Sequence, residues 1–589
     1  MVHCETCESP VYRLEKRLTG AFDSDDIFQR LSPYLGRNAP VDVLDLWPAT
    51  GQLSAKIHEY LRPRRHVLIE PNLERWGVFL HPLVAGKPGM EVQSWDPYTY
   101  EHWGSFLQEH FPEQRVPDIQ NAVALPKNDT LLVLAQPMVS TNTQSHITPG
   151  RWWSAMMQDC MRQIGLHQYG SVRILATLTG NEAQAVLPRS TGDVTRISAL
   201  TESVGLHTFE VAKPYEEEDW PALQMWSTLC AKQDRVAERT AAQQIVVPSG
   251  REAPRLKLAP ARPNKDDFSP PRVYFKKHDQ MMADMVAGES FDKKDTSEEA
   301  VQARKLARAT AAKFHLENRR CEAREHLAQQ HLDLDERMRA LARAAANPRV
   351  TASELAQLND EVVRLKNAIP HEFTKFHFRV YRSYQRLLDD ARIASFSKNY
   401  DNSILAWDRR PFEPLAIHEG EQYPHVPRTL VYFEADENSP VMEKLRGLSF
   451  EKRQEAIEFF DSLSFVLRSK ETKTVAELAE DIFPGRSAND LVQTIPSLAR
   501  WAWKQLKPGS GPLPLPDETL DPTECYQANL EYDLSDTRLH GIPTTVLWDI
   551  VLEYQRVAMD LSQLQFSRLI GGTVTDYRAG GYQSKAKLR

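Results

Sequence analysis

Three acidic residues and one glycine turn stand where consecutive apolar runs of the chain end. Asp45 and Gly51 bracket the loop Asp45-Leu-Trp-Pro-Ala-Thr-Gly51, which follows one apolar run and precedes a helix-like stretch. A turn with few large side chains at this position lets the backbone approach a nucleotide-type ligand. Glu70 ends the next run, where it can accept hydrogen bonds from ribose hydroxyls, and Asp96 follows a third, where it can meet an adenine amino group. Each signal alone is that of an ordinary turn, but their order predicts a cofactor site.

This order of motifs resembles that of the S-adenosylmethionine-dependent rRNA adenine dimethyltransferases. In that superfamily an acid and three glycines form the first loop, an acid ends the second strand, and an aspartate follows the third. An Asn-Leu-Pro-Tyr-like tetrapeptide follows the fourth strand, and here its place is taken by Ala135, Gln136, Pro137 and Met138. The resemblance implies an α/β fold, with a doubly wound, Rossmann-like methyltransferase domain.

The departures from the family pattern bear on catalysis. Trp47 and Ala49 stand where the first two loop glycines belong, so that only Gly51 remains, and an indole at 47 obstructs the approach of a ligand to the backbone. Ala135 replaces the asparagine that would hold the target adenine amine, and Met138 replaces the aromatic ring that would stack on the flipped base. We therefore expect no catalytic residues in this tetrapeptide.

The cofactor positions are accordingly interpreted as vestigial; they are Asp45, Gly51, Glu70 and Asp96. We expect no bound cofactor, and S-adenosylmethionine only if the loop is still competent to hold it. No metal site is expected either, because the CxxC of Cys4 and Cys7 has no second cysteine or histidine pair to complete it.

A retained scaffold with a lost tetrapeptide resembles the fungal mitochondrial transcription factor B branch of the superfamily. Two further blocks carry this resemblance, residues 169–202 and residues 403–433, and it extends over roughly residues 20–212 and 400–506. It implies a mitochondrial matrix protein that confers promoter recognition and melting on a single-subunit mitochondrial RNA polymerase. The implied partners are that polymerase and promoter DNA, or rRNA for a ribosomal relative. The alternatives are an active rRNA adenine N6-methyltransferase and a catalytically dead protein associated with the mitochondrial ribosome.

Candidate nucleic-acid contacts form a basic stripe at helical spacing. The stripe consists of Lys375, Arg379, Arg382 and Arg386, with Phe376, Tyr381 and Tyr384 interleaved. Cations at this spacing share one helix face, where they attract phosphates, and aromatic rings can stack on unpaired bases. The alternative is a solvated helix face over the edge of an aromatic core.

Two other basic segments have weaker patterns. One run comprises Arg304, Lys305, Arg308, Lys313, Arg319 and Arg320, but Glu317, Glu322 and Glu325 are mixed into it. The C-terminal segment after Asp576 contains no acid and carries Arg578, Lys585, Lys587 and Arg589. In the family that the chain resembles, such a tail is thought to lie near the template strand in the polymerase, and a tail without function is the alternative.

Apolar runs and helical stretches alternate over the first 240 residues, which is typical of an α/β sheet. Strands are predicted at 41–47, 66–70, 130–135 and 172–178, with a helix through Trp152, Met156, Met157 and Met161 before the last. Such an alternation favours a mostly parallel sheet. Residues 403–411 and 429–433 are interpreted as a strand pair that closes the domain.

The remaining chain divides by composition. The predicted domains are 1–240 (α/β), 241–295 (Pro-rich linker), 296–394 (helical insertion), 395–435 (closing strands), 436–510 (small all-α C-terminal domain) and 511–589 (extension and basic tail). In the insertion, Thr351 and Glu354 form a capping box before an apolar stripe from Leu355 to Ile369, which Pro370 is expected to end. Trp501 and Trp503 are expected in the core of the C-terminal helices.

Composition sets limits on the class of protein. The chain has 589 residues, 41% hydrophobic and 26% charged, with a net charge of −8. This balance is typical of globular domains, and no apolar stretch is long enough for a membrane span. A nucleic-acid surface must therefore be a local basic patch on an acidic chain. The N-terminal basic residues are interspersed with glutamates, so the sequence by itself does not identify a mitochondrial presequence.

Overall fold

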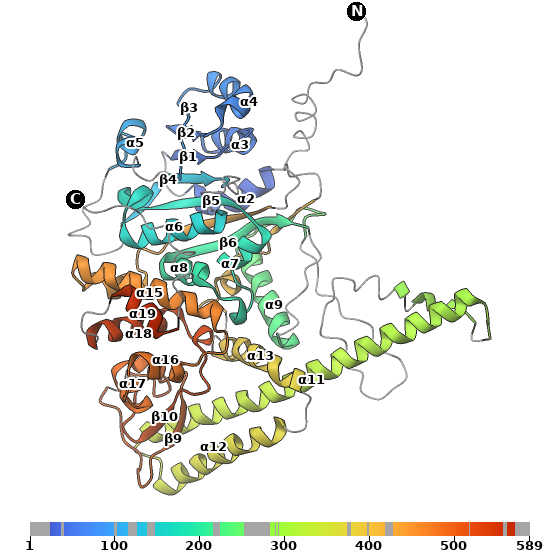
Figure 1. Ribbon diagram of the computed structural model, residues 1–589, viewed down its shortest axis with the longest axis vertical. Coiled ribbons are helices and arrows are strands. Elements are labelled where there is room, and N and C mark those ends of the chain that lie inside the picture. The colour runs from blue at the N-terminus through green and yellow to red at the C-terminus, as the bar shows by residue number, and fades with distance from the viewer. Residues whose placement is uncertain are drawn as a thin grey trace, which may run out of the picture.

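The fold is seen in a computed structural model of the chain (Figure 1). The structure describes residues 24–36, 41–98, 103–115, 126–137, 148–215, 224–252, 283–284, 286–288, 290–292, 294–373, 378–396, 400–418, 428–517, 519–557 and 562–571. Cys4, Cys7, Met138, Lys375 and Phe376 lie outside these residues, as does the basic tail after Gly571.

The centre of the molecule is an eight-stranded sheet with the order β3-β2-β1-β4-β5-β8-β6-β7. Its strands are β1 (Asp42–Leu46), β2 (His66–Ile69), β3 (Met90–Gln93), β4 (Lys127–Ala135), β5 (Ser171–Thr179), β6 (Gly205–Pro214), β7 (Leu415–Ile417) and β8 (Arg428–Ala435). The first five run parallel, and β8 is antiparallel to both of its neighbours, β5 and β6. The four predicted strands and the mostly parallel sheet are confirmed.

One half of the predicted closing pair is wrong. Residues 429–433 do form a strand, β8, between β5 and β6. The segment from Ser403 to Pro411 instead contains a 3-10 turn at Ala406–Arg409, and the neighbouring short strand β7 pairs with β6 rather than with β8. Charged residues Asp408, Arg409 and Arg410 interrupt this segment, and Asp408 is buried against Lys232, 2.9 Å from its ammonium, which fixes a turn rather than a strand.

Helices cover both faces of the sheet. One face is covered by α2 (Ser24–Leu35), α3 (Gln52–Leu61) and α4 (Leu73–Ala85), and the other by α5 (Trp103–His110), α6 (Pro149–Arg162) and α8 (Arg196–Val204). The four residues that predicted α6 are all buried. Its start is set by Thr148, which accepts a hydrogen bond from the Arg151 N–H, and by Pro149 in the first turn.

The insertion consists of three helices, α11 (Glu298–Ala346), α12 (Ala352–Phe373) and α13 (Phe378–Phe396). The predicted capping box is confirmed, because the Thr351 hydroxyl accepts the Glu354 N–H at 3.2 Å and the Glu354 carboxylate accepts the Thr351 N–H at 2.9 Å. The prediction that Pro370 ends its helix is wrong, since α12 continues to Phe373. The proline stands in the last turn, where its missing N–H costs a single hydrogen bond of the helix.

The C-terminal domain is not all-α. Its helices α14 (Pro440–Arg446), α15 (Phe450–Ser469), α16 (Val475–Ile482), α17 (Ala488–Thr494), α18 (Thr544–Val557) and α19 (Gln563–Leu569) are joined by strands β9 (Trp503–Leu506) and β10 (Leu530–Asp533). These two strands pair across the expected boundary at residue 510. Residues up to 571 therefore belong to the same packed unit, and Trp503 lies on a strand rather than on a helix. The Trp548 indole of α18 stacks on Phe460 of α15, with ring centroids 4.1 Å apart.

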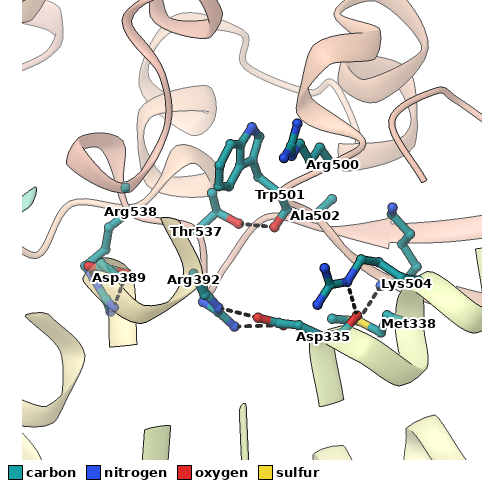
Figure 2. A pocket seen from close by; sticks show the side chains of 12 residues that line it. Asp335, Met338, Asp389, Arg392, Arg500, Trp501, Ala502, Lys504, Thr537 and Arg538 are labelled. Atoms are coloured by element: carbon teal, nitrogen blue, oxygen red, sulfur yellow. Dashed lines mark hydrogen bonds and ion pairs between the residues drawn. The ribbon is translucent and has the colours of Figure 1, made fainter. Parts of the chain in front are cut away.

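Helix α13 joins the three parts of the molecule through charged side chains. Asp389 accepts two hydrogen bonds from Arg538 of the C-terminal domain, at 2.6 and 2.7 Å (Figure 2). Asp390, the next residue, accepts from Ser190 and Thr191 of the α/β domain. Two positions later, Arg392 donates to Asp335 of α11 at 2.8 Å. Asp389 and Asp390 project about 100° apart on the helix and so contact different domains. Arg392 also donates to Asp536 at 3.0 Å, so it joins α11 to the C-terminal domain.

The Asp389–Arg538 pair should dominate the stability of this junction. Both side chains are buried, so Asp389→Asn leaves an uncompensated guanidinium and should lower the free energy of unfolding by roughly 3–5 kcal/mol. Chemical denaturation measures the loss, and the exposed α12 residue in Asp360→Asn is the control. Burial alone would raise the pKa of Asp389, but the charge of Arg538, with hydrogen bonds from His540 and Arg538, brings this pKa below its usual value.

The pH dependence of the same pair follows from that depressed pKa. The stabilisation is fully present above about pH 4, the unfolded pKa of an aspartate, and is lost as pH falls through the folded pKa. The wild type and Asp389→Asn should therefore differ most near neutral pH and converge in acid. A constant difference from pH 7 down to pH 2 would contradict this account.

Candidate functional site

The loop after β1 keeps the backbone shape of a glycine loop without most of the glycines. Trp47, Ala49 and Gly51 all have positive φ, at 56°, 53° and 71°. Left-handed backbone costs a residue with a side chain about 1–2 kcal/mol. The Trp47 N–H donates to the Ile69 carbonyl at 2.9 Å, which holds the loop to the end of β2. The two substitutions noted in the sequence therefore occupy strained positions.

Gly51 is the one loop position where no side chain fits. A Cβ atom added there would lie 2.8 Å from methyl groups of both Leu80 and Leu83 on α4. A side chain at 51 would therefore require Leu80 and Leu83 to shift and would add left-handed strain, whether or not a ligand binds.

Aromatic rings fill the space beside the loop. The Trp47 side chain is only 5% exposed. Its ring lies 4.7 Å from that of Tyr98, which follows β3, and 5.9 Å from that of Trp152 on α6. A cofactor that approaches the backbone at 47 would have to displace this packed indole, and the burial of such a side chain is worth several kcal/mol.

Glu70 holds the loop rather than projecting freely from β2. It is buried, and its two carboxylate oxygens accept the backbone N–H groups of Ala49 and Asn72, at 3.1 and 3.0 Å. Burial raises the pKa of Glu70, and the two backbone hydrogen bonds only partly offset that rise. Both oxygens thus already serve backbone donors at the place where the sequence predicts ribose binding.

The other two predicted acids do not join Glu70 in one polar cluster. Asp45 is fully buried, with an oxygen 3.7 Å from His66 Nε2, and the other ring nitrogen of His66 is 3.3 Å from His58 on α3. Asp45 therefore belongs to the contact between the sheet and α3. Asp96 is exposed and accepts the Tyr98 N–H at 3.0 Å, which forms the turn that brings Tyr98 onto Trp47.

The end of β4 and the residues after it are held by core packing and by hydrogen bonds of their backbone. Ala135 is 1% exposed and forms part of the core. The Gln136 N–H donates to the Leu46 carbonyl at 3.0 Å, which ties the segment to β1. Arg428 of β8 donates to the Pro137 carbonyl at 3.1 Å, and burial lowers the pKa of its guanidinium. The described part of this segment thus has no amide side chain at position 135.

Sequence reasoning missed the partners that occupy this region. Tyr98, Trp152 and Arg428 come from three separate segments, and no local spacing relates them to Trp47 or Pro137. One feature of the sequence could have indicated them: a tryptophan in a tight loop is expected to pack against aromatic or apolar side chains.

The structure describes only part of the basic stripe. Arg379 and Arg382 lie on the helix, but their side chains are outside what the structure describes. Arg386 donates to Glu471, which precedes α16, so it would have to leave this ion pair to contact phosphate. Tyr384 is 3% exposed and stacks on His331, with centroids 5.8 Å apart. The interpretation of Tyr384 as a base-stacking platform is therefore wrong, because the packing of α13 against α11 buries it.

Two cavities lie away from the loop. One, of about 30 Å³, sits at the α13 junction beside Arg392, Lys504 and Arg538 (Figure 2), and is large enough for roughly two water molecules. Burial lowers the pKa of Lys504 there to about 8. The second, of about 130 Å³, lies beside β6 next to the ion pair of Glu202 and Arg409. The predicted cofactor residues line neither of these two cavities.

The strain in the loop can be measured at Ala49. Ala49→Gly relieves the left-handed strain, so it should leave the free energy of unfolding unchanged or raise it by up to about 1 kcal/mol. The control is Ala309→Gly, at an exposed position on α11, which should lose about 1 kcal/mol because glycine weakens a helix. Equal losses in the two variants would show that the loop is not strained at 49.

No protein-family model matches this chain, and the comparison with curated proteins finds no match. Of the helices that the structure describes, none is both long enough and apolar enough to cross a membrane.

Proposed function

We propose that this chain is a mitochondrial transcription initiation factor built on a degenerate rRNA adenine dimethyltransferase scaffold. It would confer promoter recognition and melting on a single-subunit mitochondrial RNA polymerase and perform no chemistry itself. The observation that carries the non-catalytic half of the proposal is the buried Trp47 indole in the cofactor loop. The resemblance of the motifs carries the transcriptional half.

The sheet supports the scaffold half of this proposal. The doubly wound order 3-2-1-4-5-6 is altered here by one reversed strand, β8, between β5 and β6. The insertion and the C-terminal domain would then be additions to that scaffold, on the side of the sheet covered by α8.

The residues present do not fit S-adenosylmethionine. A cofactor needs an open loop at 47 and a free acid at 70, whereas Trp47 is packed between two rings and Glu70 serves two backbone donors. Methylation of adenine N6 also needs a polar anchor for the base, and Ala135 supplies none. These features argue against the active methyltransferase.

Promoter melting by such a factor would rest on many weak contacts. An opened strand trades base stacking for stacking on protein rings and for phosphate contacts, each worth about 1–3 kcal/mol. Lys375, Arg379 and Arg382 remain the proposed phosphate contacts, and Arg386 is available only if its pair with Glu471 opens. Recovery of the tagged chain from mitochondria separates the functions: the RNA polymerase supports this proposal, and small-subunit rRNA supports a ribosome-associated protein.

Calorimetry tests the cofactor half directly. S-adenosylmethionine titrated into the full chain should give no binding heat at micromolar concentrations, because the gain from the ligand would have to exceed the loss of the Trp47 packing. An active adenine dimethyltransferase titrated in the same buffer is the control. Low-micromolar affinity for this chain would refute the proposal that the site is vestigial.

Run-off transcription tests the polymerase half. Truncation after Gly571 removes the basic segment but keeps the Ile570 carbonyl, which accepts hydrogen bonds from Lys470 and Lys473. The melting temperature should therefore hardly change, while transcription from a duplex promoter should fall. The loss should be smaller on a pre-melted bubble. Equal activity of the full and truncated chains on the duplex promoter would contradict the role of the tail, and a large fall in melting temperature would show that the tail is structural.

A further inference from the structure

Helix α11 has two halves with different surroundings. It is 49 residues long, and from Cys321 onward its apolar residues, including Leu327, Leu334 and Leu341, are buried against α12, α13 and the C-terminal domain. The other half, residues 298–320, extends beyond the body of the molecule (Figure 1). Among the described residues, this half is packed along one side, a seam where Gly288 lies against Ala303 and Ala307 and Arg304 donates to the Asp292 carbonyl. Side chains on the opposite side are exposed.

The open side carries a row of cations. Lys305, Arg308, Lys313 and Arg319 are all exposed, and at 100° per residue they fall within an arc of about 140°. The seam residues Ala303 and Ala307 fall opposite that arc. We call the four cations the basic arm.

The acids that interrupt this run in the sequence do not interrupt it on the surface. On the same helical projection, Glu317, Glu322 and Glu325 fall outside the arc of the basic arm, and Glu322 and Glu325 are partly buried. The folded helix therefore separates charges that the sequence mixes. A positive row on a chain with a net charge of −8 favours an anionic partner.

We propose that the basic arm binds the phosphate backbone of duplex DNA, which rests on the proposed function and adds a second contact to it. From Lys305 to Arg319 the arm is about 21 Å long, and a helix of this kind fits the major groove of B-form DNA, which is about 12 Å wide. The major groove of an RNA duplex is too deep and narrow to admit it. The occupant is therefore duplex DNA beside the melted region.

An anionic membrane is a poorer fit. A helix that lies on a membrane needs a continuous apolar face opposite its cations. Here that face is the alanine seam already packed against Gly288. The exposed Val301, Leu306 and Leu316 lie on the same side of the helix as the cations, so they form no apolar face opposite them.

The test compares two variants of the full chain with equal changes in charge. The arm variant carries Lys305→Gln, Arg308→Gln and Arg319→Gln. The control carries Arg446→Gln, Lys452→Gln and Arg468→Gln, at exposed positions on α14 and α15. Binding to a labelled 30-base-pair DNA duplex of mixed sequence is measured by fluorescence anisotropy over a range of salt concentrations.

The arm variant should lose about three units of the log–log salt slope, since each phosphate contact contributes about 0.9, and the control should keep the wild-type slope. Circular dichroism of both variants should match the wild type, because every changed side chain is exposed. The same slope in the arm variant and the wild type would overturn the proposal. So would an equal loss in both variants, since net charge would then explain the binding.

Two further ligands separate the remaining outcomes. A loss seen on anionic phosphatidylserine vesicles but not on DNA would assign the arm to a membrane, and a loss confined to duplex RNA would assign it to RNA; either result overturns the proposal. Failure of the proposed function looks different. If the polymerase is never recovered with the chain, but the arm variant still loses its DNA salt slope, DNA binding by the basic arm is supported and the role as an initiation factor is contradicted. If the arm variant still supports promoter-dependent initiation and has the salt slope of the wild type, DNA binding by the arm is contradicted and the role as an initiation factor is supported.

Discussion

The arrangement of the three parts of this molecule depends on buried charges that α13 presents in nearly successive positions. Asp389 faces Arg538 in the C-terminal domain, Asp390 faces the Ser190 turn of the α/β domain, and Arg392 faces Asp335 on α11. Buried charges are tolerated only with partners, so none of these contacts can open without a cost of several kcal/mol. The helical insertion is therefore a connecting element with a defined direction, and the orientation of the projecting half of α11 follows from the anchoring of its other half.

The loop after β1 illustrates how a left-handed backbone is maintained in residues that carry side chains. Trp47 and Ala49 keep the left-handed conformation because hydrogen bonds from the ends of neighbouring strands hold them there. The Glu70 carboxylate is the main such support, and Trp47 offsets its own strain by burying an indole between two rings. The same contacts that stabilise the loop take up the groups that a nucleotide would need. Stability and ligand binding thus compete for the same atoms at this site.

Charge on this protein is distributed by tertiary pairing more than by sequence runs. Arg386 looks like the end of a basic stripe but is paired with Glu471, whereas the run that begins at Arg304 looks mixed but presents its exposed cations on one side of a helix. A cation is paired where a second element brings an acid close to it, as at Arg386, whereas the cations of the basic arm are exposed on the projecting half of α11.

Local patterns determined much of the scaffold: the buried runs of β1, β2, β4 and β5, the α6 helix, and the capping box at Thr351. Each of these elements depends on residues within one turn or one strand, so it can be predicted from the sequence without knowledge of the fold. Only the tertiary structure decided that β8 enters the sheet between β5 and β6, that β9 pairs with β10 across the expected domain boundary, and that Tyr384 is buried. The contacts of Asp389 and Tyr98 could not be predicted from the sequence either, since their partners lie far away in the chain. Contacts of that kind are chosen by which surfaces meet in space, and no spacing along the sequence records them.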